Sequence, residues 1–328
     1  MDLRRRHLFN PFKKRQVSPN APSLDDVDLD LEQIAGALGA YEGIPRVNWD
    51  VVREAVKPYC DHQGIDRIWL ELAAQWLGIL GRALNPVYKL YEGRHLLMLT
   101  PAKPERVKLL LEVGDAAYER LQRLVPRTTS QRGYGKHAVI VMGATDQYYA
   151  YLAYYHPEHE KPIATSAGTF LNHGYRHTVI NGQRNTDYRT LVHELAHDSV
   201  SHLTLPLWLD EGIAQSVEDM VPDYRPPIID GRQARLHRRY WSWFGLDHFW
   251  KGTSFRAVSS QRVSYQLSDI LFRNLRNDRK RGKRLGDFIT TASRKDAGEQ
   301  ACRECFGCSL GDLAAEFLGP GKWNPAGT

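Results

Sequence analysis

The chain has 328 residues, of which 42% are hydrophobic and 25% are charged, and its formal net charge is only +6. These values are ordinary for a globular protein that is long enough to bury a core, and they exclude a wholly disordered chain. No run of about 18 apolar residues occurs, which excludes a membrane-spanning helix, and no apolar run follows the basic residues as a secretory signal requires. The sequence therefore predicts a soluble, cytoplasmic protein.

The first 30 residues are dominated by charge. Two basic triplets, Arg4-Arg5-Arg6 and Lys13-Lys14-Arg15, precede an acidic block that starts at Asp25. Such a segment buries too little apolar surface to fold alone, so residues 1–30 are predicted to be a disordered tail. The basic residues can touch nucleic acid, an anionic membrane or an acidic partner, but no aromatic-rich nucleic-acid signature accompanies them. No firm nucleic-acid or membrane partner is therefore predicted, and the oligomeric state stays open.

Residues 31–90 read as a helical module. Apolar residues recur at helical spacing over three runs, which are Leu31–Leu38, Trp49–Tyr59 and Ile68–Leu84. The module contains no catalytic constellation. A second domain is predicted over residues 91–320.

The first half of that second domain alternates strands and helices. The residue pattern predicts strands at Arg94–Leu99, His137–Met142 and Thr178–Asn181, and helices at Glu105–Leu124 and Asp146–Tyr155. The polar residues 156–175 are predicted to be a loop. A run of helices follows residue 187, and it includes a strongly amphipathic helix over Val263–Leu275.

The most informative stretch is His193-Glu194-Leu195-Ala196-His197. On a helix, residues four apart lie on the same face, so both imidazoles can reach one metal ion. Glu194 can then reach a water molecule on that ion and accept its proton. The pattern predicts zinc-dependent hydrolysis, whereas the simpler alternative is an ordinary helix with two surface histidines.

A third metal ligand is expected from a second helix that folds back over the first. Pro206 ends the first helix, and Trp208 and Leu209 can begin the next. Glu211 would then face both histidines, and Gly212 would let the two helices approach closely. A set of two histidines and one glutamate leaves a fourth zinc position for water, as in catalytic sites.

Two other residues compete for the role of third ligand. His202 follows His197 by five positions, and Asp210 is the neighbour of Glu211 but points about 100° away from it on the helix. Further along, Glu218 lies seven positions after Glu211 on the same face, and Asp219 follows it. Either carboxylate can accept a hydrogen bond from a ligand imidazole, or it can simply be solvated.

The chain has four cysteines, Cys60, Cys302, Cys305 and Cys308. The last three follow one another at intervals of three, which is the start of an iron–sulfur pattern, but the expected Cys-Pro is missing. Reduced structural thiols are favoured over a metal site.

HELAH followed by PLWLDEGIAQSVED resembles the gluzincin metallopeptidases, in particular the peptidase-MA-like group, over residues 92–318. The resemblance implies an α+β, zincin-like domain with a small mixed sheet, an active-site helix and a helical C-terminal lobe. It also suggests that the strand at residues 178–181 is the edge along which a peptide lies, although an ordinary interior strand would have the same sequence. Tyr265 and Ser268 match a Tyr-x-x-Ser helix of that group. The 14 positions between His197 and Glu211 are fewer than in the large aminopeptidases, and no G-x-M-E-N stretch is present, which puts exopeptidase activity in doubt.

The predicted function is therefore peptide-bond hydrolysis with one catalytic Zn²⁺, bound by His193, His197 and Glu211. Glu194 would move the proton, and Tyr265, with Tyr240 behind it, would donate to the oxyanion. The substrate would be a peptide or protein, and the enzyme an endopeptidase or a dedicated processing protease. Two alternatives remain, namely an inactive zinc-binding recognition module and a nucleic-acid-associated protein that uses the tail and residues 279–284.

Overall fold

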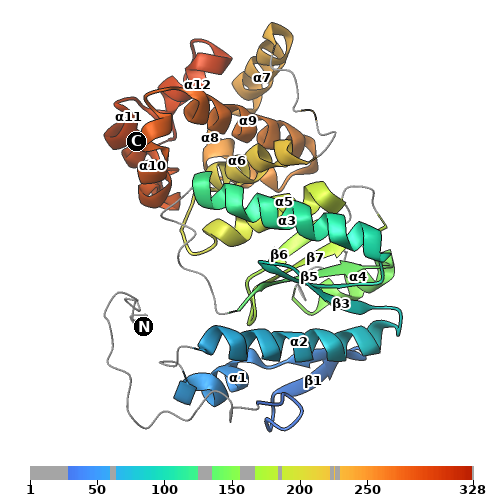
Figure 1. Ribbon diagram of the computed structural model, residues 1–328. Helices are drawn as coiled ribbons and strands as arrows, with labels where there is room; N and C mark the ends of the chain where they lie inside the picture. The colour runs from blue at the N-terminus through green and yellow to red at the C-terminus, as the bar shows by residue number, and fades with distance from the viewer. Residues whose placement is uncertain are drawn as a thin grey trace.

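The computed structural model describes residues 29–59, 64–124, 135–155, 167–183, 187–221, 225 and 230–326. Apart from residues 29 and 30, the predicted tail lies outside these ranges. The described chain is a mixed α+β protein in which a five-stranded sheet separates two groups of helices (Figure 1). The predicted α+β class is thereby confirmed. None of the described helices combines the length and the apolar character needed to cross a membrane.

The segment before the sheet holds a hairpin and two helices. Strands β1 (Leu38–Tyr41) and β2 (Ile44–Val47) pair antiparallel, and α1 (Trp49–Val56), the short 3₁₀ helix η2 (Lys57–Tyr59) and α2 (Ile65–Leu84) follow. The predictions of a helix near residue 49 and of another up to residue 84 are confirmed. The predicted helix Leu31–Leu38 is wrong, because residues 31–37 form turns that lead into β1. Gly36 has a φ of +78°, a left-handed conformation that ends any helix there.

The central sheet has the strand order β3-β4-β5-β7-β6. The inner strands β4 (Leu96–Thr100), β5 (His137–Met142) and β7 (His177–Asn181) are parallel, whereas β3 (Lys89–Glu92) and β6 (Gly168–Leu171) run antiparallel to their neighbours. The parallel strands are buried along their whole length, as expected when helices cover both faces. The sheet is thus small and mixed.

Two predictions about this sheet are wrong. The strand over residues 178–181 is not an edge, because β7 lies between β5 and β6. The edge position on this side of the sheet belongs to β6, within the segment that was predicted to be a loop. Its four residues, Gly-Thr-Phe-Leu, are too few to produce a recognisable alternation.

Each face of the sheet has its own hydrophobic core. The helices α1, α2 and α4 (Thr145–Ala153) cover one face, and α3 (Pro104–Leu124) and α5 (Asp187–Val200) cover the other (Figure 1). Trp49, Leu72 and Leu77 from the N-terminal segment share their core with Leu97 and Ile140 of the sheet. The expected boundary at residue 90 falls within β3.

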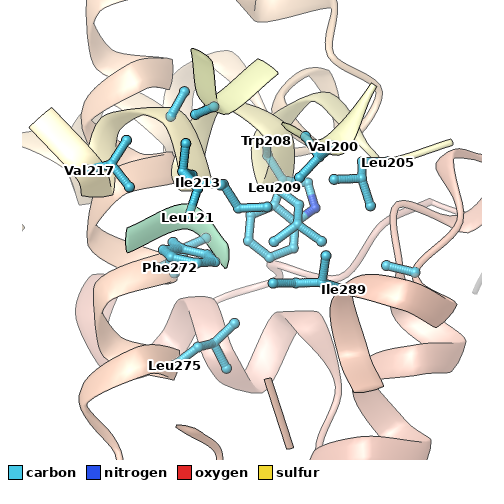
Figure 2. Close-up of a cluster of buried hydrophobic side chains, with 14 of the residues drawn as sticks. Leu121, Val200, Leu205, Trp208, Leu209, Ile213, Val217, Phe272, Leu275 and Ile289 are labelled. Atoms are coloured by element: carbon cyan, nitrogen blue, oxygen red, sulfur yellow. The ribbon is translucent and has the colours of Figure 1, made fainter. Parts of the chain in front are cut away.

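The C-terminal lobe consists of helices that extend the second core. It contains α6 (Leu207–Val217), η3 (Glu218–Met220), α7 (Gly231–Phe244), α8 (Asp247–Trp250), η4 (Thr253–Phe255), α9 (Val258–Asn277), η5 (Gly282–Arg284), α10 (Leu285–Thr291), η6 (Arg294–Asp296), α11 (Glu299–Phe306) and α12 (Leu310–Leu318). Figure 2 shows Trp208, Leu209 and Ile213 of α6 pointing among Phe272 and Ile289 of this lobe. The apolar face of α6 is thereby fixed, and its polar face is turned to α5.

Gly212 has a different role from the one expected. A Cβ at this position would lie 2.9 Å from both the Cβ of Phe272 and the carbonyl oxygen of Ser268. The glycine therefore permits close approach of α6 to α9 rather than to α5. Because α9 holds α6 from behind, its position against α5 is set by tight packing.

Candidate metal centre

The two histidines of the HELAH stretch lie on one face of α5 and converge at their ring tips. Their ring centroids are 4.8 Å apart, and the two Nε2 atoms are separated by 3.1 Å. The spacing of four residues on a helix produces this arrangement, as expected. Both side chains are largely buried, at 16% and 18% exposure for His193 and His197.

Glu211 completes a group of three possible metal ligands. Glu211 lies on α6, and its Oε2 atom is 3.5 Å from His193 Nε2 and 3.8 Å from His197 Nε2. The same oxygen is buried and has no hydrogen-bond partner in the structure. Within the described ranges, these three side chains form the one group of histidine, cysteine or acidic residues that can hold a metal ion.

The three ligand atoms fit a single small cation. For a tetrahedral ion with ligand bonds of about 2.0–2.2 Å, ligand atoms lie about 3.3–3.6 Å apart. The observed separations of 3.1, 3.5 and 3.8 Å bracket that range. A buried carboxylate oxygen with no donor is costly unless a cation satisfies it. The residues present therefore suit a bound metal ion.

The far nitrogen of each imidazole is held by a second carboxylate. His193 Nδ1 lies 2.9 Å from Glu218 Oε1, and His197 Nδ1 lies 2.8 Å from Asp210 Oδ1. Such partners keep the proton on Nδ1, so that Nε2 presents its lone pair to the ion. Glu218 is itself fixed by an ion pair with Arg189. The solvated alternative for Glu218 is excluded, because its side chain is only 2% exposed.

The local field also favours a cation. Burial lowers the pKa of His193, but the neighbouring carboxylates of Glu211, Glu218 and Glu194 together raise it by more, so that it lies well above its usual value. Burial likewise opposes the charge on His197, and the carboxylates of Asp210 and Glu211 raise its pKa to about 9. A surplus of carboxylates that stabilises protons at this place will also stabilise a divalent ion, which competes with those protons.

Glu194 lies against β6, one of the two edge strands of the sheet. Its Oε2 atom accepts a hydrogen bond of 2.8 Å from the backbone N–H of Phe170 in β6. The side chain is buried, so little water competes for its carboxylate. The sequence analysis did not foresee this contact, because it treated residues 156–175 as a loop.

Tyr265 reaches the site from α9. Burial is the main reason that its pKa lies far above the usual value, and the nearby charges of Glu211 and Glu194 raise it further. The phenol therefore stays protonated, and its hydroxyl interacts with Glu211. Tyr240, the second choice from the sequence, lies on α7 with its ring stacked on Phe244.

Several other residues weighed in the sequence analysis lie elsewhere. His202 is near Arg176 and Asp198, and Asp219 pairs with Arg120 and Arg273. Asp210 is not in the ligand group, but its contact with His197 makes it part of the site, which its angle on α6 alone did not indicate. The thiols of Cys302, Cys305 and Cys308 are free, and Cys60 lies outside the described residues.

Comparison with protein-family models, curated proteins and solved structures found no match for this chain.

Proposed function

We propose that this protein is a zinc-dependent peptidase of the gluzincin type with a zincin-like domain. The observation that carries the proposal is the convergence of two imidazole Nε2 atoms with a donor-free carboxylate oxygen. Glu194, which follows His193 on α5, supplies a second carboxylate, and this carboxylate is not one of the three metal ligands. Metal-assisted hydrolysis needs one carboxylate that binds the metal and another that transfers protons.

Zinc is the ion that suits this ligand set best. Two imidazoles and one carboxylate are typical ligands of catalytic zinc sites, which keep one further position open. When bound, zinc supplies Lewis-acid activation of water and polarisation of the scissile carbonyl. His193, His197 and Glu211 would hold it, while Asp210 and Glu218 orient the two imidazoles.

The remaining chemistry falls to two side chains. Glu194 takes a proton from the attacking water on its carboxylate and later gives that proton to the leaving amine. Tyr265 keeps its proton because of burial and neighbouring negative charge, so it can donate a hydrogen bond to the oxyanion that develops on the carbonyl. The charges of both Glu194 and Glu211 act on Tyr265, which supports a common reaction centre.

The sheet edge supports a peptide as the substrate. β6 is one of the two edge strands, and its Phe170 amide donates to the proposed general base. An extended peptide that adds to such a strand gains backbone hydrogen bonds that do not depend on its sequence. The scissile bond of that peptide would pass beside Glu194, as expected of an endopeptidase or processing protease.

The proposal is tested with the substitution Glu194→Gln. The amide has almost the same shape but cannot accept a proton, so zinc content should be unchanged while peptide cleavage falls by about 10²–10⁴-fold. Glu112→Gln, at an exposed position on α3, is the matched control and should behave as the wild type. Cleavage of a mixed peptide library is followed by mass spectrometry on zinc-loaded protein. A zinc-loaded wild type that cleaves nothing would instead support an inactive recognition module.

A further inference from the structure

A cavity of about 460 Å³ lies between the N-terminal segment and one end of the sheet. Its walls come from α1 and η2, from α2 and α3, from the starts of β4 and β5, from the residues after β6, and from the end of α5. The volume is within the range of about 300–1,000 Å³ that is typical of ligand pockets. The zinc site does not include any of the residues that line it, so the cavity is a separate feature.

The inner part of the cavity is aromatic. Trp69, Tyr118 and Tyr175 line it and are all at least nine-tenths buried. The rings of Trp69 and Tyr175 lie 6.4 Å apart, and the Tyr175 hydroxyl donates to the carbonyl oxygen of Lys136 at 2.6 Å. The rings are thus held in fixed positions before a ligand arrives. Such walls favour a flat apolar group.

The outer part of the cavity carries basic side chains, two of them at its exposed mouth. The cavity is lined by the two carboxylates Glu54 and Asp198 and by four cations, which are Arg53, Lys57, Lys136 and Arg176. Lys136 is paired with Glu92 outside the cavity. Asp198 is buried deep beside His137 at 3.3 Å and Arg176 at 3.4 Å. Arg53 on α1 pairs with Asp50, and Lys57 at the start of η2 pairs with Glu54, but the two basic side chains stay 49% and 70% exposed. Exposed ion pairs of this kind are weak, so Arg53 and Lys57 can exchange their partners for acidic groups of a ligand.

The cavity continues the line of β6. Phe170, whose amide touches Glu194, stacks its ring on His137 of the cavity wall with centroids 6.2 Å apart. Asn172, also a wall residue, follows two positions later. Because a strand rises about 3.3 Å per residue, the cavity begins about 7 Å along the strand from Glu194. A peptide lying beside β6 would bring a side chain to the cavity within two residues of the scissile bond.

We propose that this cavity is a specificity pocket that takes an aromatic side chain of the substrate, with acidic residues on either side of it at the cationic mouth. The inference rests on the proposed peptidase function and adds a substrate class to it. It also gives the N-terminal segment a role, because Arg53, Lys57 and Trp69 all come from that segment. The aromatic ring would supply affinity by burial, and the flanking acids would supply charge complementarity.

Binding to the zinc-loaded Glu194→Gln full-length chain tests the pocket without requiring turnover. The probe is the fluorescein-labelled heptapeptide Ala-Ala-Glu-Trp-Glu-Ala-Ala, with counterparts in which Trp becomes Ala or both Glu become Lys. Fluorescence anisotropy should show binding of the first peptide about tenfold tighter than either counterpart. Adding Arg53→Glu and Lys57→Glu should weaken binding of the Glu-flanked peptide by about three- to tenfold. The same change should not weaken binding of the Lys-flanked peptide. Both positions are exposed, so folding should persist.

The matched control is Arg232→Glu with Arg235→Glu, the same charge change on exposed positions of α7 away from the cavity. This pair should leave all three affinities unchanged. Equal affinity for the three peptides, or equal loss from both charge reversals, would overturn the specificity pocket. If wild-type protein binds the Trp peptide with this selectivity but cleaves no peptide, the pocket stands and only the proposed peptidase function is refuted.

Discussion

Zinc affinity should depend on Glu218, although this residue cannot touch the ion. The Glu218 carboxylate accepts from His193 Nδ1 at 2.9 Å, and its side chain is only 2% exposed, so water cannot replace it. Partners of this kind change metal affinity by about 10–100-fold. Glu218→Gln keeps an oxygen that can accept the same hydrogen bond but loses the charge, so about tenfold weaker binding is expected. Glu218→Ala loses both and should approach 100-fold, or about 2.7 kcal/mol.

Competition with a chromophoric zinc chelator at pH 7.5 measures these affinities, and circular dichroism verifies folding. Asp219→Asn is the matched control, because that neighbouring carboxylate pairs with Arg120 and Arg273 and not with an imidazole. It should leave zinc affinity within about threefold of the wild type, well short of the effect of losing an imidazole partner. If Glu218→Ala bound zinc as tightly as the wild type, or if Asp219→Asn weakened it more, the argument from imidazole orientation would be refuted.

Three other changes have expected outcomes. Tyr265→Phe should lower kcat about 10–1,000-fold with little change in KM, since an oxyanion donor acts in the transition state; equal kcat would remove it from the mechanism. Gly212→Ala should lower the free energy of unfolding by about 1–3 kcal/mol, because the new Cβ meets Phe272 at 2.9 Å, whereas Gly286→Ala, with open space around it, should not. Burial lowers the pKa of His177 from 6.5 to about 3. Between pH 6.5 and pH 3 the unfolded chain therefore binds a proton that the folded chain does not, so the stability of the folded chain falls as pH falls. His177→Gln should reduce the stability lost between pH 7.5 and pH 5 by about 2 kcal/mol in urea titrations; an unchanged loss would contradict this.

The sequence predicted best those features that depend on local spacing. The long apolar runs produced α2, α3 and β5 near their predicted bounds, because burial of one periodic face determines such elements. The imidazoles of His193 and His197 meet because residues four apart lie on the same face of a helix. The role of Glu211 was harder to predict, because its position depends on how α6 crosses α5. The break at Pro206, the angle between neighbouring residues on a helix and the resemblance of PLWLDEGIAQSVED to the gluzincins favoured it over Asp210 and His202.

Features that depend on long-range packing were missed. The four-residue β6 gains its structure by pairing with β7, and so its sequence alone looks like loop. Asp210 seemed to point away from the metal when only the α6 helix was considered, yet its carboxylate meets His197 from α5. The cavity joins α1 to residues more than 100 positions later, and no pattern in one segment can reveal such a surface.

Metal content is the most direct test of the proposed zinc site. Inductively coupled plasma mass spectrometry on purified wild-type protein should find about one zinc ion per chain, as a single tetrahedral site requires. Glu211→Gln replaces the donor-free anionic oxygen with an amide and should retain almost none, whereas His202→Ala should retain as much as the wild type. The account would be contradicted by full zinc occupancy in Glu211→Gln, or by loss of zinc in His202→Ala.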